Sequence, residues 1–301
     1  MLEPDLLCAL LAALDERGYD FVTTSPATHA RFLSKRAAAR PGDLRDVFGW
    51  SLPFDTLEPE LLDLMQTAGI VDQTPEGRRR SKLRVSRVRG RLFLHSAFPT
   101  TDEDSIFLGP DSYRFADFIL SNLSGPAARI VDLGAGAGVG GILAGAAAPG
   151  AEVVLADLNR NALALAAANA AYAGVPVTLL ESDGLNAAPA EIDLVVANPP
   201  FMADSESRAY RDGGGALGAE LSVDWARQAA ARLRPGGRML LYSGSAIVDG
   251  QDGLKAGLQQ IEGVGLEYRE IDPDIFGEEI SRPGYEEVER IAAVGAIITR
   301  L

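Results

Sequence analysis

The sequence predicts an α/β protein with a mostly parallel sheet, preceded by a small and mainly helical N-terminal region. From about residue 105 onward, short apolar runs typical of strands alternate with Ala- and Leu-rich runs typical of helices. This alternation indicates βαβ units. Before that point the chain shows helical periodicity and then a basic segment. We therefore expect two domains, residues 1–104 and 105–301, in agreement with a length of 301 residues and roughly 150 residues per domain.

The composition is that of a globular protein. Hydrophobic residues make up 47% and charged residues 23% of the chain, which argues against disorder, collagen and coiled coil. One cysteine and two histidines allow no intramolecular disulfide and argue against a His/Cys zinc site, so we expect no metal. The N-terminus carries no basic region, and the longest small-apolar run of the chain, residues 140–150, is about half of a membrane span. We expect a cytoplasmic protein without membrane association.

The net charge of −14 is unevenly distributed along the chain. Residues 1–100 hold 14 basic and 13 acidic side chains, whereas residues 101–301 hold 14 basic and 29 acidic ones. Such an acidic chain argues against broad, sequence-independent binding of nucleic acid. A local basic face is still compatible with it.

Three helices are expected in the first 75 residues. Leucines recur at helical spacing over the first fourteen residues, and Gly18 is typical of the end of such a helix. Ser25 and Pro26 are typical of an N-cap and a first helical residue. A third, short helix is expected over residues 58–68.

Residues 76–100 predict a β-hairpin with a basic surface. Eight of the fourteen residues from 78 to 91 are cations, and they interleave with apolar residues. Helices followed by such a hairpin are typical of a small winged-helix-like module. Cations of this segment, Arg84, Arg87 and Arg89 among them, are candidates to hold the phosphates of a nucleic acid. A solvated loop, or pairing with the acidic domain, explains the run equally well.

Seven strands are expected after residue 105. They are the apolar runs 129–133, 152–157, 175–180, 193–197, 238–243, 266–271 and 291–299. Helices are expected between the earlier strands, for example at residues 159–172 and 216–233. No helix-length pattern separates the last two strands, so we expect these two to form an antiparallel pair.

The first of these strands ends in a glycine-rich turn. Asp132 precedes a run in which Gly134, Gly136 and Gly138 lead into a helix of small residues. Glycines permit a positive φ and let backbone N–H groups approach a ligand. Gly136, Gly138 and Gly141 also satisfy the dinucleotide fingerprint. The turn alone does not separate NAD from another nucleoside cofactor, and a tight turn with close helix packing is the structural alternative.

Two later strands end in polar motifs. Asp157 ends the second strand, where a carboxylate can accept both hydroxyls of a ribose or cap the following helix. Asn198-Pro199-Pro200-Phe201 follows the strand at 193–197. The prolines hold the backbone rigid and leave its carbonyls free, so an amide oxygen, a carbonyl and a flat ring come together. This combination suits an NH₂ group on a planar system; a strand terminator with a core phenylalanine is the alternative.

In this order and spacing, the motifs resemble those of the class I S-adenosylmethionine-dependent methyltransferases. The resemblance covers residues 105–300 and is to the N-methylating branch with an N-P-P-[YF] motif. That branch includes ribosomal RNA guanine-N2, adenine-N6 and release-factor glutamine methyltransferases. The resemblance implies a Rossmann-like seven-stranded sheet in the order 3-2-1-4-5-7-6 with strand 7 antiparallel. It also implies that residues 1–104 recognise the substrate.

The resemblance implies S-adenosyl-L-methionine as the cofactor. The three glycines of the turn would line its methionine part, Asp132 would help to hold its amino group, and Asp157 would bind its ribose. Asp183 would accept a hydrogen bond from the adenine amino group, and an ordinary aspartate in a loop is the alternative for it. Tyr113 lies in a segment that folds over the cofactor in this family, and a core aromatic at a helix cap is the alternative for it.

The implied reaction is methyl transfer to a planar NH₂ nitrogen. Asn198 Oδ1 and the Pro199 carbonyl would accept its two N–H bonds, beside Pro200 and Phe201. The expected acceptor is a nucleobase amine in RNA or DNA, with Arg211 of the following glycine-rich loop meeting a phosphate or carboxylate. A glutamine amide of a protein is the alternative acceptor. A non-catalytic cofactor-binding module or a nicotinamide dehydrogenase would leave the N-P-P-F motif unexplained, and the oligomeric state is not predicted.

Overall fold

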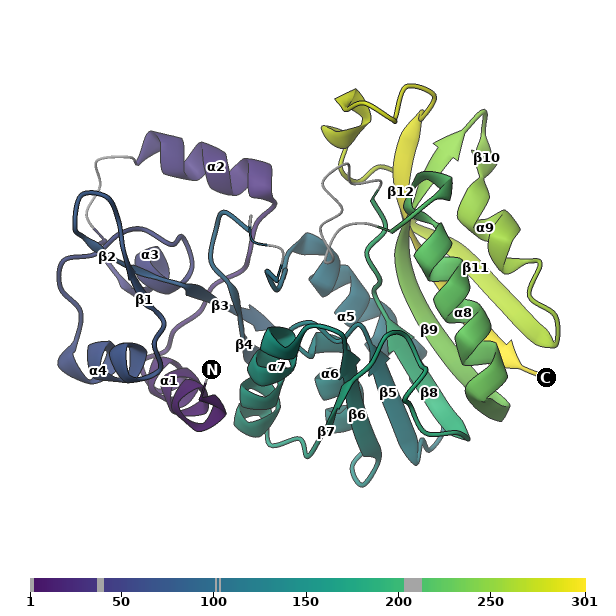
Figure 1. Cartoon of the computed structure of the whole chain (residues 1–301), viewed down its shortest axis with the longest axis horizontal. Coiled ribbons are helices and arrows are strands. Elements are labelled where there is room, and N and C mark those ends of the chain that lie inside the picture. The colour runs from purple at the N-terminus through teal and green to yellow at the C-terminus, as the bar shows by residue number, and fades with distance from the viewer. Residues whose placement is uncertain (1–2, 37–40, 101, 103, 203–212) are drawn as a thin grey trace.

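The computed structural model describes residues 3–36, 41–100, 102, 104–202 and 213–301 (Figure 1). The fold is α/β, as predicted. A large twisted sheet with helices on both faces makes up the C-terminal part, and a smaller group of helices and hairpins lies beside it. The carboxyl ends of parallel strands are the edge at which ligands bind in such sheets.

The large sheet has the strand order predicted from the resemblance. Its strands are β5 (Arg129–Leu133), β6 (Glu152–Asp157), β7 (Thr178–Glu181), β8 (Ile192–Ala197), β9 (Leu233–Val248), β11 (Val264–Asp272) and β12 (Arg290–Arg300). They are arranged as β11-β12-β9-β8-β5-β6-β7, and the short β10 (Gln251–Asp252) pairs with β9. Numbered along the chain, this order is 3-2-1-4-5-7-6. The last strand, β12, is antiparallel to both of its neighbours.

Helices cover both faces of this sheet. One face carries α5 (Pro110–Asn122), α6 (Val139–Ala147) and α7 (Arg160–Ala173), and the other carries α8 (Glu220–Arg232) and α9 (Gly253–Leu258). Successive residues of a strand join the two cores in turn, since Val196 packs in the first core and Ala197 in the second. Burial on both faces explains why these strands are continuous apolar runs in the sequence. Two short 3₁₀ helices are η1 (Ala216–Gly218) and η2 (Glu279–Ser281).

The N-terminal part contains the three expected helices and one more. These helices are α1 (Pro4–Glu16), α2 (Pro26–Lys35), α3 (Leu44–Phe48) and α4 (Pro59–Thr67). Ser25 caps α2 as predicted, because its hydroxyl accepts from the Thr28 N–H. Two antiparallel hairpins follow, β1 (Val71–Gln73) with β2 (Arg79–Ser81) and β3 (Leu83–Val88) with β4 (Arg91–Ser96).

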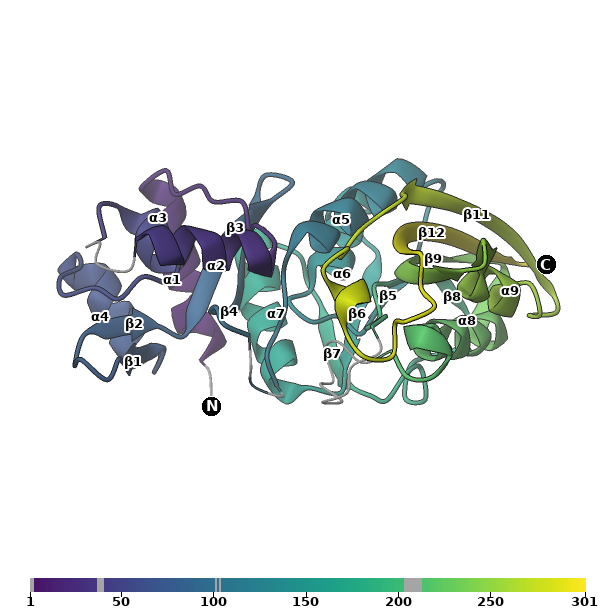
Figure 2. The same cartoon turned by 90° about the horizontal axis from the view of Figure 1, so that it is seen from above.

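The N-terminal part packs on the α7 side of the sheet, as the view from above shows (Figure 2). Leu7 and Leu10 of α1 belong to the same buried cluster as Ala166 and Ala170 of α7. One hydrophobic core therefore spans both parts of the chain. The domain boundary after residue 104, and the winged-helix-like character of the first part, stay predictions.

Two features that are absent from the described residues bear on partners. Among them, no helix combines the length and apolar character that a bilayer span requires. Within the same residues, no group of three or more His, Cys, Asp and Glu side chains is arranged to hold a metal ion.

Candidate active site

The sheet brings the predicted site residues to one edge. Leu133 of β5 is in register with Ala156 of β6 and with Ala197 of β8. The residues that follow these positions therefore stand at the same level, at the carboxyl ends of adjacent parallel strands. They are the glycine turn, Asp157 and Asn198.

The glycine turn is packed on one side and open on the other. Gly134, Gly136 and Gly138 all have a positive φ, at 67°, 53° and 80°, which other residues adopt only with strain. A Cβ on Gly134 would lie 2.5 Å from the Trp225 ring of α8, so this glycine is needed for close packing. At Gly136, no described atom lies within 4 Å of the place a Cβ would take. A ligand can therefore approach the backbone there.

Asp157 is bonded to the glycine turn. Its Oδ2 accepts from the Gly136 N–H at 2.8 Å and its Oδ1 accepts from the Asn159 N–H at 2.8 Å. Burial raises the pKa of the Asp157 carboxyl, and these hydrogen bonds counter the rise. The N-cap of α7 is Asn159, whose side chain accepts from two N–H groups of the first turn. Asp157 thus stabilises the turn rather than capping the helix.

Asp132 is buried beneath the same turn. Only 2% of the residue is exposed, and its Oδ2 accepts from the Gly141 N–H at 2.7 Å. Burial raises the pKa of this carboxyl to about 7, the Asp157 charge adds to the rise, and the bond from Gly141 opposes it. A cation placed beside Asp132 would favour its ionised form.

Asn198 holds a buried acceptor at the end of β8. Its Oδ1 is out of contact with solvent and has no hydrogen-bond partner among the described residues. A buried polar atom without a partner costs free energy, so a donor from outside the described chain is expected there. Pro199 is buried and Pro200 is half-buried, and neither can donate a hydrogen bond from its backbone.

Phe201 lies beside a second aromatic ring that the sequence did not indicate. Its ring packs on Gly244 of β9, where a Cβ would lie 2.3 Å from it. The ring of Phe276 is tilted by 51° to it, at a centroid separation of 5.9 Å. Phe276 has a φ of 59°, an uncommon conformation for a bulky residue and one that clusters at functional sites. No sequence pattern marked Phe276, because it lies in the long connection between β11 and β12.

Leu158 is a further residue that the sequence analysis did not single out. It directly follows Asp157 at the carboxyl end of β6 and is 64% exposed. A leucine in this position exposes an apolar surface beside a carboxylate that is suited to ribose. Its place immediately after Asp157 was the signal that could have identified it.

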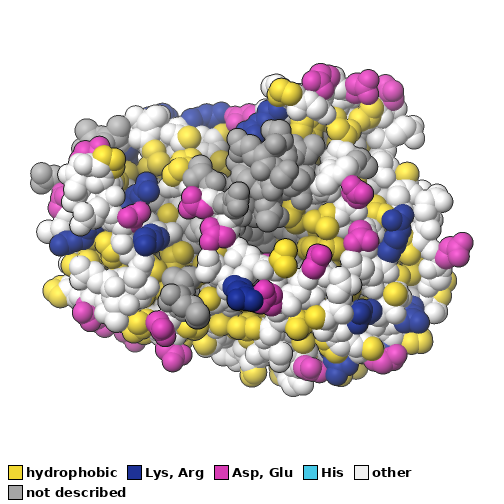
Figure 3. Space-filling model, viewed as in Figure 1, with side chains coloured by type: hydrophobic (Ala, Val, Ile, Leu, Met, Phe, Trp, Pro, Cys, Tyr) yellow, Lys and Arg dark blue, Asp and Glu magenta, His cyan; other side chains and the backbone are white. Residues whose placement is uncertain are grey.

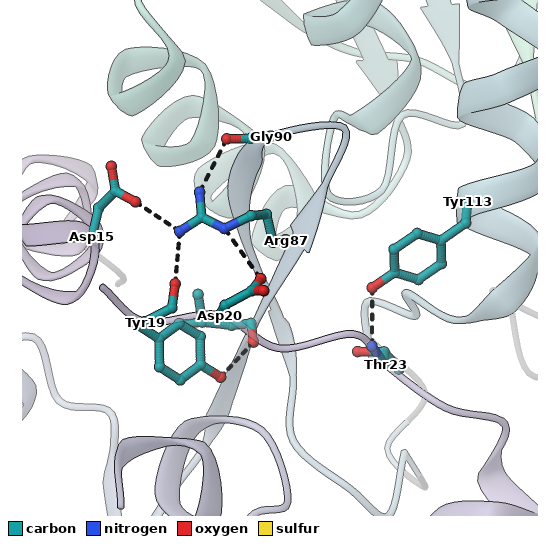
Figure 4. A network of polar contacts seen from close by, with 8 residues as sticks. Asp15, Tyr19, Asp20, Thr23, Arg87, Gly90 and Tyr113 are labelled. Carbon is teal, nitrogen blue, oxygen red and sulfur yellow. Dashed lines mark hydrogen bonds and ion pairs between the residues drawn. The ribbon is translucent and has the colours of Figure 1, made fainter. Parts of the chain in front are cut away.

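The other predicted cofactor and acceptor residues are less closely tied to this edge. Asp183 is exposed and follows β7 by two residues. Tyr113 accepts a hydrogen bond from the Thr23 N–H at 2.9 Å (Figure 4). That contact joins Tyr113 to the N-terminal part, and its assignment to the cofactor stays a prediction. Arg211 lies outside the described residues.

The structure contradicts the prediction of a basic hairpin surface at Arg84. This residue is only 2% exposed, and its guanidinium donates to the Ser96 carbonyl at 3.1 Å and contacts His29 Nδ1 at 3.2 Å. Nearly all of β3 is buried on both faces, so no outward position is left at residue 84. The buried guanidinium cannot contact the phosphates of a nucleic acid.

Other arginines of the hairpin are held by acidic residues. Arg87 forms ion pairs with Asp15 and Asp20 at 2.7 and 3.2 Å (Figure 4), and Arg89 pairs with Asp117 of α5. Figure 3 shows basic and acidic side chains interspersed over one face of the molecule. Only the pair of Arg89 with Asp117 corresponds to the alternative in which the run pairs with the acidic domain, because the partners of Arg87 lie in the N-terminal part.

The chain is similar to known methyltransferases. The family model described as methyltransferase small domain matches residues 114–264. A release factor glutamine methyltransferase of Cereibacter sphaeroides is 35% identical over 202 residues, which are 62% of this chain and 68% of that protein. A ribosomal RNA small subunit methyltransferase C of Pseudomonas putida is 31% identical over 135 residues, 44% of this chain and 38% of that protein.

Two solved structures share the fold of this chain. The tRNA m1G37 methyltransferase of M. jannaschii has a TM-score of 0.51 at 14% identity, covering 73% of this chain and 57% of that one. Trm5b of Pyrococcus abyssi has a TM-score of 0.51 at 16% identity, with coverages of 76% and 62%. At these identities the likeness concerns the fold alone.

Proposed function

The chain belongs to the methyltransferase small domain family, and from that premise we propose that it transfers a methyl group from S-adenosyl-L-methionine to a planar NH₂ nitrogen. The observation that carries this proposal is the buried Oδ1 of Asn198, which has no partner among the described residues. An acceptor in that position needs a donor, and an amide or nucleobase NH₂ group supplies one. The rigid Pro199-Pro200 backbone supports a fixed geometry for it.

The residues at the edge of the sheet fit the cofactor. The open backbone at Gly136 leaves space for the methionine part. The Asp157 carboxylate uses two acceptor positions on the turn and Asn159, and a carboxylate has about four, so the ribose hydroxyls can be accepted as well. Leu158 offers an exposed apolar surface beside it for the adenine ring. When bound, the cofactor supplies a methyl group already activated by a sulfonium sulfur.

Asp132 fits a role beside the cationic amino group. Its carboxyl is buried and has a pKa raised to about 7, so a neighbouring ammonium group would lower that pKa and form a strong charge-assisted bond. Asp183 is proposed to accept from the adenine amino group. Its exposed position two residues after β7 leaves it accessible to a ligand at this edge.

The acceptor site holds and orients the nitrogen. Asn198 Oδ1 and the Pro199 carbonyl accept its two N–H bonds and direct the lone pair toward the methyl group. Phe201 and Phe276 provide the aromatic walls for the planar group. Such orientation can supply roughly 7–11 kcal/mol in the best cases. The two histidines of the chain, His29 and His95, are buried in the N-terminal part and do not act as a base here, so the proton that the nitrogen loses as it takes up the methyl group would pass to water.

We propose the side-chain amide of a protein glutamine as the acceptor, with residues 1–104 as the recognition region. The release factor glutamine methyltransferases of Cereibacter sphaeroides and Bordetella pertussis support this choice, since the match spans 68% and 69% of their lengths. Pairing of Arg87 and Arg89 with acids, and burial of Arg84, weaken the support for RNA docking. A nucleobase amine is the second candidate, favoured by similarity to the ribosomal RNA methyltransferases.

Transfer from methyl-tritiated cofactor tests the proposal. The purified protein is incubated separately with total protein and with total RNA from cells that lack this gene. Label in protein, recovered as methylglutamine after digestion, is the expected result. Label in RNA alone would select the nucleobase acceptor instead. A protein that binds S-adenosylhomocysteine but labels neither pool would contradict both macromolecular acceptors.

A further inference from the structure

A buried amide connects the N-terminal part with the glycine turn. Asn169 lies in α7 and is completely buried. Its Oδ1 accepts from the backbone N–H of Leu94 in β4 at 2.8 Å, and its Nδ2 donates to the Leu94 carbonyl at 3.1 Å. The same Nδ2 also donates to the Ala137 carbonyl at 2.8 Å. One side chain thus contacts both the hairpin and the turn.

The two bonds with Leu94 resemble those between neighbouring strands. Leu94 pairs with Val85 of β3 on one side, and its N–H and carbonyl both bond to the Asn169 amide. The amide therefore takes the place of a further strand along this stretch of β4. Pairing of this kind fixes the position of the amide, because its acceptor and donor are both engaged.

Ala137 lies in the part of the turn that is proposed to hold the cofactor. It stands between Gly136, whose N–H is held by Asp157, and Gly138, the N-cap of α6. Ala137 is only 3% exposed, so its carbonyl would lose its donor if Asn169 were removed. The turn is anchored at two adjacent residues. Asp157 of β6 holds Gly136, and Asn169 of α7, which also bonds to the hairpin, holds Ala137.

We propose that Asn169 is a positioning residue that couples the β3–β4 hairpin to the cofactor-binding turn. The hairpin then contributes to cofactor affinity without touching the cofactor. This inference rests on the proposed function, because it concerns the same turn. It gives the N-terminal part a role in the cofactor site in addition to its proposed role in recognition.

Hydrogen exchange on the unaltered protein provides the first test. Addition of S-adenosylhomocysteine is expected to slow exchange in the turn, residues 134–141, and also in β4, residues 91–96. The hairpin at residues 71–81 belongs to the same N-terminal part, but the hydrogen bonds of Asn169 to described residues go to Leu94 and Ala137, so exchange in that hairpin should not change. Protection of the turn without protection of β4 overturns the coupling. Absence of binding and of any protection contradicts the proposed function instead.

A matched pair of variants provides the second test. Asn169→Asp keeps the size and the acceptor of the side chain but removes the donor to the Leu94 and Ala137 carbonyls. We expect the dissociation constant for S-adenosylhomocysteine to rise at least about tenfold, the usual scale for losing a buried hydrogen bond. The protection of β4 on binding should also disappear. The control is Asn122→Asp in α5, where the side chain donates to the Phe118 carbonyl at 2.6 Å, and its affinity should stay within twofold.

Kinetics separate positioning from simple loss of structure. In Asn169→Asp, the KM for the cofactor should rise while kcat at saturating cofactor stays within about threefold of the original value. The proposal is overturned if this variant binds S-adenosylhomocysteine as tightly as the unaltered protein. It is also overturned if kcat falls while the KM for the cofactor does not change. If this variant does not fold, the exchange experiment on the unaltered protein decides the question.

Discussion

Asn198 is the residue on which the chemistry of the proposed site depends. Its side-chain oxygen is buried and without a partner among the described residues, whereas the oxygens of Asp132 and Asp157 already hold the glycine turn. The two carboxylates therefore have a structural contribution in addition to any cofactor contact. Within the part of the chain that the structure describes, Asn198 has no such bond at Oδ1, so its replacement should act mainly on the acceptor.

Replacement of Asn198 by Ala should lower turnover while leaving cofactor affinity nearly unchanged. Loss of one preorganised polar contact to the reacting group typically costs on the order of 10²-fold in kcat. The measurement combines calorimetry with S-adenosylhomocysteine and methyl transfer to the natural acceptor. Asn198→Asp, which retains an acceptor oxygen, is the matched control and should be less impaired. Equal turnover of Asn198→Ala and the unaltered protein would refute the assignment.

At the scale of elements, strands buried on both faces were the easiest to predict. β5, β6 and β8 agree with the expected runs to within one residue, because parallel strands covered on both faces are continuously apolar. β7 begins at Thr178 instead of residue 175, beyond Pro176, which has no N–H for a ladder. Likewise α8 begins at Glu220 instead of residue 216, after a 3₁₀ turn.

The hairpin β3–β4 shows what the sequence could not indicate. Its basic residues were expected on a solvent-facing side, but Arg84 is buried and a distant segment of the chain lies against the hairpin. The Phe21 carbonyl accepts from the Arg87 N–H, and Thr23 contacts Ser86 and His95. No local pattern encodes such a long-range contact. Phe276 was missed for a similar reason, since its neighbour Phe201 is far away in the sequence.

Two buried histidines near this hairpin, His29 of α2 and His95 of β4, are predicted to behave unusually. The pKa of His29 is lowered to about 4, mainly by burial and also by the Arg84 charge, while a hydrogen bond to the Trp50 carbonyl opposes the decrease. Burial also lowers the pKa of His95 well below its usual value, again with a contribution from Arg84. In the unfolded chain both rings would titrate near pH 6.5. The unfolded state therefore binds more protons between pH 6.5 and 4, and the histidine contribution to stability is lost as the pH falls through this range.

Proton NMR of the ring Cε1–H groups tests this directly, because the chain has two histidines. Both signals should stay at the neutral position down to pH 5.5. The histidines alone should make the free energy of unfolding in urea smaller at pH 5 than at pH 6.5. Asp132 acts in the opposite direction. Because its pKa is raised to about 7, this carboxyl contributes stability at low pH, and the contribution is lost as the pH rises through 7. The NMR titration of the ring protons reports the histidine contribution alone. A ring that titrates near pH 6.5 would contradict the buried arrangement.

For the whole molecule, the main feature is a core that both parts share. Residues of α1 and α7 pack in one cluster, Asn169 bonds to β4 and to the glycine turn, and Tyr113 of α5 bonds to Thr23. Contacts of this extent favour cooperative unfolding. A boundary after residue 104 would then separate the region that recognises the acceptor from the catalytic region, although both regions would unfold together.

The two tryptophans of the chain report on the two parts separately. Trp50 stacks on Phe32 in the N-terminal part, and Trp225 packs against Gly134. Trp50→Phe leaves only the second reporter and Trp225→Phe only the first. In each variant we expect the fluorescence transition in urea to coincide with that of far-UV circular dichroism. A fluorescence transition of Trp50 that precedes the circular dichroism transition would show an independently unfolding N-terminal domain.

The distribution of charge over the molecule predicts how acceptor binding depends on salt. Residues 101–301 carry 14 basic and 29 acidic side chains, and Arg78, Arg87 and Arg89 of the N-terminal part are paired with acids. A nucleic acid held through six to ten phosphates would lose about 10³- to 10⁵-fold in affinity between 50 and 200 mM salt.

We therefore expect the KM for the acceptor to change less than about tenfold over this range. The measurement is methyl transfer at saturating cofactor and several salt concentrations. The dissociation constant for S-adenosylhomocysteine, determined at the same concentrations, is the control that separates acceptor binding from cofactor binding. A steep rise of the acceptor KM with constant cofactor affinity would require phosphate contacts that the paired arginines do not provide. This result would identify the acceptor as a nucleobase of a nucleic acid instead of a protein amide. Only a polyanion such as a nucleic acid carries enough charge to make the acceptor KM depend so steeply on salt.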